Sequence, residues 1–187
     1  MTRYDVKDLL KLPGEGEETA SDMVIKARAR DTGGDFSVME GTIGSRKLLA
    51  PHIHKFEDQL VFVITGELVF EVDGEDGLQF SAPAGSYIQK PRGIQHAFWN
   101  STDEDVRYIE LSGRERFEGY VDSQKNGQLE STLKAEADWG MVWKFDDVQR
   151  LMEENDLDGL ANSESGDVSE HPDLPEKVKE LLKKFKK

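Results

Sequence analysis

The stretch that decides the fold reads PHIHKFEDQ, residues 51–59. His52 and His54 are two residues apart, so on a β-strand both side chains point to the same face. A third histidine, His96, lies further along in GSYIQKPRGIQHAFWN, residues 85–100, and the whole chain has four histidines. Two imidazoles on one strand face, joined by a third from a distant strand, predict an open, nitrogen-rich metal site.

The two segments carry a family resemblance. In the second, Gly85, Pro91, Gly93, His96 and Asn100 occupy the defined positions of the second cupin motif. We expect these glycines and the proline to form turns and Asn100 to fix backbone.

The first segment resembles the first cupin motif, in which His-x-His is followed by four residues, position 59, six residues and Gly66. Two positions depart from the family pattern: Arg46 stands where a glycine is usual, and Gln59 replaces the usual glutamate ligand. The resemblance implies an all-β fold, a cupin-type double-stranded β-helix (jelly-roll) barrel with short helical N- and C-terminal extensions.

The chain divides into five predicted segments. Apolar spacing predicts a helix at 5–12, and composition predicts an acidic linker and then an amphipathic tail. A membrane surface is a second interpretation of the basic tail, but docking on the same chain or a neighbour is favoured. The segments are an N-terminal helix and covering strand (1–35), the barrel (36–121), a C-terminal segment packed on it (122–155), an acidic flexible linker (156–171) and a basic amphipathic tail helix (172–187).

Composition limits the classes of function. The 187 residues are enough for one barrel with extensions, and the chain has no cysteine for a disulfide or a thiol nucleophile. A net charge of −14 argues against nucleic-acid binding. The N-terminus lacks the apolar core of a signal peptide, and no apolar run approaches the ~20 residues of a membrane span. We therefore expect a cytoplasmic protein without membrane or nucleic-acid partners.

Strand parity places the side chains around the predicted site. If Gln59 faces the lumen, Val61 and Val63 face it too, and Phe98 faces inward beside His96. These three apolar residues predict a mostly apolar substrate pocket.

The outward face of the same strand is apolar as well, because Leu60, Phe62 and Ile64 alternate with the lumen residues. A face of this kind must be covered, so we expect a homodimer. The alternative is that the second sheet and the N-terminal extension bury it.

Gln59 and Glu57 are the candidate catalytic residues. A glutamine offers a neutral carbonyl oxygen, which is a weaker ligand than a carboxylate and no base near neutral pH. Glu57 shares a face with Gln59 by parity and would compensate, together with Asp58. The favoured alternative is that both acids are simply solvated.

The resemblance implies a quercetin-dioxygenase-like cupin with His52, His54 and His96 as ligands and Gln59 in the fourth place. The cofactor would be one divalent transition metal, Fe, Mn, Ni, Co or Zn. The substrate would be a small chelating enol or diketone, flavonol-like or a polyketide. With iron the enzyme would be a dioxygenase, an oxidoreductase; with zinc or nickel it would be an isomerase or cyclase. The alternative function is a non-catalytic cupin that binds a small molecule or metal for regulation or storage.

Overall fold

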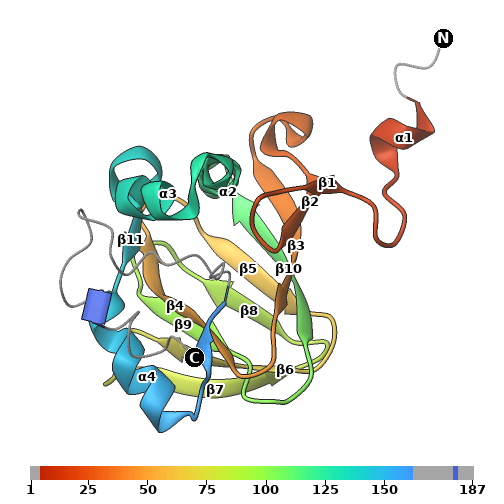
Figure 1. The fold of residues 1–187 in the computed structure, drawn as a ribbon. Helices are drawn as coiled ribbons and strands as arrows, with labels where there is room; N and C mark the ends of the chain where they lie inside the picture. The colour runs from red at the N-terminus through yellow and green to blue at the C-terminus, as the bar shows by residue number, and fades with distance from the viewer. Residues whose placement is uncertain (1–4, 162–178, 181–187) are drawn as a thin grey trace.

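The computed structural model describes residues 5–161 and 179–180. In this part of the chain, two β-sheets pack face to face around a common core (Figure 1). The first sheet has the strand order β1-β2-β3-β10-β5-β8, and the second has the order β11-β4-β9-β6-β7 with β12 paired to β4. This arrangement confirms the predicted all-β, double-stranded β-helix fold with a few short helices.

The strands follow the apolar alternation and glycine turns of the sequence. In β5, for example, Gln59, Val61 and Val63 are buried while Leu60 and Phe62 are half-buried, as parity predicts. The strands are β1 (Glu17–Glu18), β2 (Met23–Ala27), β3 (Phe36–Ile43), β4 (Lys47–His54), β5 (Gln59–Val63), β6 (Glu67–Val72), β7 (Leu78–Pro83), β8 (Tyr87–Lys90), β9 (His96–Trp99), β10 (Val106–Gly113), β11 (Met141–Trp143) and β12 (Gly159–Leu160).

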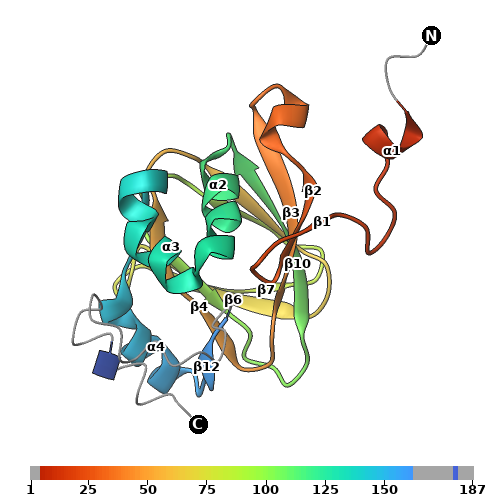
Figure 2. The same cartoon turned by 45° about the horizontal axis from the view of Figure 1, so that its top comes forward.

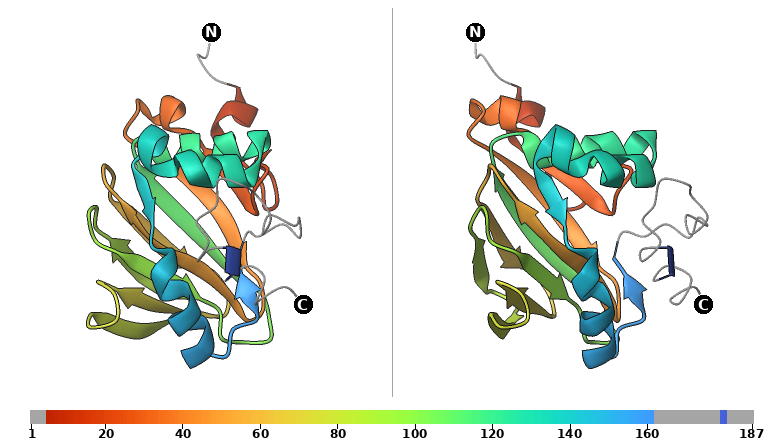
Figure 3. Two further views of the ribbon diagram at one scale, coloured as in Figure 1. Left: turned by 60° about the vertical axis from the view of Figure 1, so that its left-hand side comes forward. Right: turned by 90° about the vertical axis from the view of Figure 1, so that its left-hand side faces the viewer.

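Helical segments cover one end and one side of the two sheets. Directly after β10, a run of short helices crosses the end of the barrel (Figures 1 and 2). The helix α4 instead lies along the outside of the second sheet (Figure 3). The helical segments are α1 (Val6–Leu9), η1 (Ala29–Thr32), α2 (Arg116–Ser123), η2 (Gln124–Asn126), α3 (Gln128–Lys134), η3 (Ala135–Trp139), η4 (Phe145–Asp147) and α4 (Val148–Glu154).

Two apolar clusters result from this layout. The larger one fills the barrel between the sheets, and the smaller one lies between the second sheet and α4. Ala97 and Trp99, which point outward from β9 as parity predicts, are buried in the smaller cluster against Leu151. An ion pair of 2.8 Å between Arg150 and Glu71 also ties α4 to β6. This chain therefore covers the outer face of its own second sheet.

The turn residues of the two motifs act as expected. The Nδ2 of Asn100 donates to the carbonyl oxygens of Ile43, Gly44 and Glu104, so this side chain fixes a turn. Gly93 has a φ of +79°, a conformation that favours glycine.

Arg46, which stands where the family has a glycine, adopts the same left-handed region with a φ of +56°. Its guanidinium pairs with Asp103 at 3.1 Å. The departure in sequence is therefore accommodated without a change of fold.

Three segment expectations need correction. The N-terminal helix is α1 alone, shorter than the predicted 5–12. The predicted covering strand is β2, which pairs with β3 and extends the first sheet rather than lying over it. Part of the predicted flexible linker forms β12, parallel to β4. Residues 162–171 of the linker and nearly all of the tail lie outside the described residues.

No helix among the described residues is long and apolar enough to cross a membrane. The outward residues Leu60, Phe62 and Ile64 are half-buried, and Tyr87 beside them is exposed. The homodimer stays a prediction.

Candidate metal centre

The three predicted histidines meet inside the barrel. His52 and His54 lie at the end of β4, and His96 begins β9 directly opposite His52 in the strand register. Their ligand nitrogens all lie within 4.8 Å of one another. The three side chains are almost fully buried, with 2 %, 4 % and 1 % of their surface exposed. The structure thus brings together the residues that the spacing singled out.

Backbone carbonyls orient two of the rings. The Nδ1 of His52 lies 2.8 Å from the oxygen of Ala50, and the Nδ1 of His96 lies 3.2 Å from the oxygen of Ile94. A proton on each Nδ1 makes both hydrogen bonds and leaves each Nε2 with a lone pair. These two Nε2 atoms face each other at 3.1 Å. Two facing lone pairs repel unless a cation lies between them.

The distances fit a metal ion. Two nitrogens bound to one zinc at about 2.0–2.1 Å lie roughly 3 Å apart, close to the separation of the His52 and His96 nitrogens. The Nε2 of His54 is buried and has no hydrogen-bond partner among the described residues. A set of three imidazoles with one unmatched nitrogen suits a divalent transition metal.

The protonation of the histidines also fits. Burial lowers the pKa of all three imidazoles, that of His52 to about 3, and the charge of Lys90 lowers each of them further. The rings are therefore neutral at pH 7, which is the form that binds a metal. The contact of 3.8 Å between His54 and Glu57 is accordingly not an ion pair.

Gln59 lies on the opposite sheet, at the start of β5, and is 4 % exposed. Its Nε2 donates to the Oγ of Ser112 at 3.3 Å, while its Oε1 is buried without a partner in the described chain. An inward amide oxygen is available as a ligand atom. Its role as fourth ligand or catalytic residue stays a prediction.

The two acids between the histidines and Gln59 have different surroundings. Asp58 is exposed and accepts hydrogen bonds from Arg92, as expected for a solvated acid. For Glu57 that interpretation is wrong, because only 3 % of this residue is exposed. Burial raises the pKa of Glu57 to about 7, although the backbone amides of Phe117 and Arg116 oppose the shift. Helix α2, which covers the turn, excludes this carboxyl from water.

The raised pKa predicts a pH effect in the metal-free protein. The carboxyl of Glu57 ionises near pH 4.5 when unfolded and near 7 when folded, so stability falls as pH rises through this window. Glu57→Gln removes the penalty, which is at most about 3 kcal/mol at pH 8. We expect thermal melts to show the variant more stable than wild type at pH 8 and nearly equal to it at pH 4. Asp58→Asn is the matched control, and an equal gain at both pH values would contradict the prediction.

An ion pair that the sequence analysis missed lies beside the centre. The Nζ of Lys90 donates to the Oε2 of Glu110 at 2.8 Å, and both side chains are almost fully buried. Burial lowers the pKa of Lys90 and raises that of Glu110, while the contact between them opposes both shifts. The alternation along β10 could have indicated that Glu110 points inward, because it shares the inner face of this strand with Val106 and Tyr108.

Aromatic side chains close the centre from the helical end. The ring of Phe117 in α2 meets that of His54 edge-on at 5.2 Å, and Trp143 in β11 lies 5.1 Å from His52. β11 itself pairs with the end of β4 that carries the histidines. Strand β11 with Trp143, which lies beyond the predicted barrel, therefore helps to close the site.

The predicted pocket residues Val61, Val63 and Phe98 all point inward and are fully buried in the main core. The wall facing the histidines is more polar than expected, because Gln59, Lys90 and Glu110 share it.

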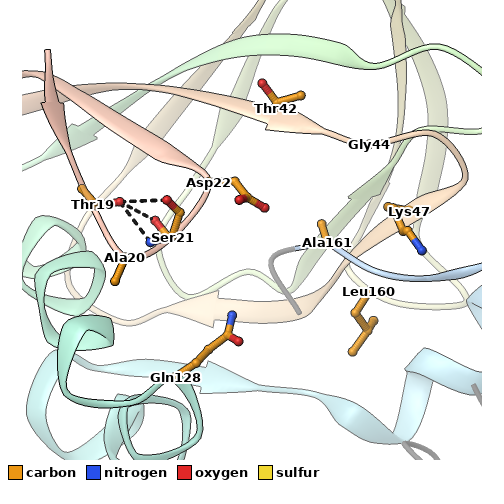
Figure 4. A pocket seen from close by; sticks show the side chains of 10 residues that line it. All are labelled: Thr19, Ala20, Ser21, Asp22, Thr42, Gly44, Lys47, Gln128, Leu160 and Ala161. Atoms are coloured by element: carbon orange, nitrogen blue, oxygen red, sulfur yellow. Dashed lines mark hydrogen bonds between the residues drawn. The ribbon is translucent and has the colours of Figure 1, made fainter. Parts of the chain in front are cut away.

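A separate pocket of about 480 Å³ lies at the other end of β4, near Lys47 (Figure 4). None of the residues that line it is buried, and the hydroxyls of Thr19 and Ser21 bond to each other at 2.8 Å. The buried ligand-type side chains are at the histidine end.

Comparison with known proteins agrees with this geometry. Residues 36–112, which span β3 to β10 and include all three histidines, match the model of the cupin domain. This segment is a cupin domain. No curated protein matches the chain.

Solved structures resemble this chain at low identity. KdgF from Halomonas sp. is 20% identical, with 56% of this chain and 90% of that chain covered and a TM-score of 0.46. A putative sugar phosphate isomerase from Acidithiobacillus ferrooxidans is 18% identical over 59% and 78% of the two chains, with a TM-score of 0.47. The cupin domain of Cnp3 from Schizosaccharomyces pombe is 14% identical over 63% and 78%, with a TM-score of 0.46.

Proposed function

We propose that this cupin is a metal-dependent enzyme that acts on a small chelating substrate, such as an enol, a hydroxy-ketone or a diketone. The reaction would be dioxygenase-type cleavage, or isomerisation or cyclisation. The observation that carries the proposal is the convergence of three buried imidazoles, two of which place their Nε2 atoms 3.1 Å apart.

His52, His54 and His96 would hold the ion, with the Oε1 of Gln59 as a further candidate ligand. A bound divalent ion supplies Lewis acidity, and redox chemistry where it is iron or manganese. The backbone carbonyls of Ala50 and Ile94 keep two of the rings in the correct tautomer.

Glu57 is the candidate proton-transfer group. Burial raises its pKa to about 7 in the metal-free protein, and its Oε2 is buried without a partner among described residues. Phe117 and Trp143 exclude water from the same end of the barrel. Glu57 would thus provide the acid–base function that Gln59 cannot.

The burial of the centre favours a second candidate, a non-catalytic cupin that retains a metal or small molecule. All three histidines are at most 4 % exposed, and the rings of Phe117 and Trp143 pack against His54 and His52. A closed site of this kind would also suit a permanently bound ion.

Elemental mass spectrometry of protein purified without a metal-affinity tag separates these possibilities. We expect close to one transition-metal ion per chain in wild type and none in His52→Ala/His54→Ala. Protein reloaded separately with Fe, Mn, Ni, Co and Zn should then turn over an enol, diketone, flavonol or polyketide, with O₂ uptake for the iron form. Metal without turnover supports the non-catalytic cupin, and no metal after reloading overturns the enzyme and leaves a cupin that binds a small molecule.

A further inference from the structure

The inner face of the first sheet carries a group of buried polar residues, Gln59, Lys90, Glu110 and Ser112, which we call the inner polar cluster. Gln59 lies opposite Lys90 across β5 and β8, and opposite Ser112 across β5 and β10. The Nζ of Lys90 lies 5.4 Å from the ring centre of Phe98, which follows His96 on the inner face of β9. The cluster therefore faces the sheet that carries the histidines.

The cluster has hydrogen-bonding capacity to spare. Glu110 accepts from Lys90 through Oε2, but its Oε1 and the Oε1 of Gln59 are buried without partners in the described part of the chain. Lys90 has three hydrogens and uses one of them on Glu110. A buried acceptor without a donor costs about 1–3 kcal/mol. A hydroxyl group matches this set, because it can donate to Glu110 or Gln59 and accept from Lys90.

The charges of the centre favour an anion. The net charge of Lys90 and Glu110 is zero whether the proton between them lies on the amine or on the carboxylate. The three histidines contribute no charge when they bind a metal. A divalent ion would therefore leave a buried charge of about +2, or +1 with Glu57 ionised. Buried charge without a counter-charge is unfavourable. A carboxylate on the ligand would balance it, whereas a neutral hydroxy-ketone would not.

We propose that the substrate is a small carboxylate that carries hydroxyl groups, and that Lys90, Glu110 and Gln59 recognise a hydroxyl of it. The inference rests on the proposed function, because the bound metal supplies the charge that the carboxylate balances. It narrows the substrate class from chelating compounds in general to hydroxy acids.

Isothermal titration calorimetry on the zinc-loaded protein tests the proposal with four probes. Propionate has the carboxylate alone, lactate adds a hydroxyl that can chelate, and glycerate adds a second hydroxyl for the cluster to recognise. Hydroxyacetone is the neutral hydroxy-ketone. The metal content of each sample is measured in parallel.

We expect glycerate to bind about tenfold more tightly than lactate, and both to bind more tightly than hydroxyacetone. Lys90→Met/Glu110→Leu keeps the net charge and the histidines, so it should still bind zinc and lactate. It should lose the gain for glycerate, which is its tighter binding relative to lactate. Lys134→Met/Glu130→Leu, at an exposed pair of the same residue types, is the matched control and should keep that gain.

Two results would overturn the proposal while leaving the metal enzyme intact. One is hydroxyacetone binding as tightly as glycerate to zinc-loaded protein. The other is a glycerate gain that survives in Lys90→Met/Glu110→Leu. Protein that takes up no zinc would instead overturn the proposed function, and this inference with it.

Discussion

Lys90→Met alone should lower the free energy of unfolding by about 3–5 kcal/mol, because it leaves the carboxylate of Glu110 buried without its partner. Lys90→Met/Glu110→Leu should recover most of this loss, since apolar side chains of similar volume need no partner. The two changes should therefore be strongly non-additive.

Chemical denaturation of the metal-free variants at pH 8 and pH 5 measures the effect. Burial raises the pKa of Glu110, so its charged form destabilises the fold once the pH exceeds the pKa of this carboxyl in the unfolded chain. The loss of unfolding free energy in Lys90→Met should therefore be smaller at pH 5 than at pH 8. Lys134→Met at the exposed pair with Glu130 should barely change stability. A small, pH-independent loss for Lys90→Met would show that Glu110 gains another partner in the fold.

His96→Ala should abolish the stabilisation that a metal ion gives to this protein. Zinc at a hundred times its dissociation constant should stabilise the wild type by about 2.7 kcal/mol, which raises the melting temperature by roughly 5–10 °C. The variant lacks one of three converging nitrogens and should melt at the same temperature with or without zinc.

Differential scanning fluorimetry with and without zinc measures this response, and circular dichroism checks that the variant is folded. His171→Ala changes the fourth histidine of the chain and is the control that should keep the full response. A zinc response in His96→Ala equal to that of wild type would contradict the proposed ligand set.

Much of the fold follows from local pattern. The period-2 spacing of His52 and His54 places both on one strand face, and the same parity correctly directs Val61, Val63 and Phe98 inward. These predictions succeed because strand alternation depends only on neighbouring residues. The predicted turns are correct for the same reason, since a left-handed backbone such as that at Gly93 favours glycine whatever packs around the turn.

The surroundings of Glu57 could not be predicted in this way. The carboxyl is buried because α2, which begins almost sixty residues later, lies over the turn that carries it. The apolar outer face of β9 is likewise covered by α4 rather than by another chain. Coverage depends on which distant segment packs where, and strand alternation carries no information about it.

The sequence by itself determined the barrel, the three histidines and the direction of the side chains along each strand. Only the tertiary structure decided that Lys90 meets Glu110, because β8 and β10 are not neighbours in the sheet and both flank β5. A charged residue predicted to face inward has no assigned partner until the strand order is known. The physical reason is that side-chain direction is a local property, whereas burial and pairing depend on contacts between segments far apart in the chain.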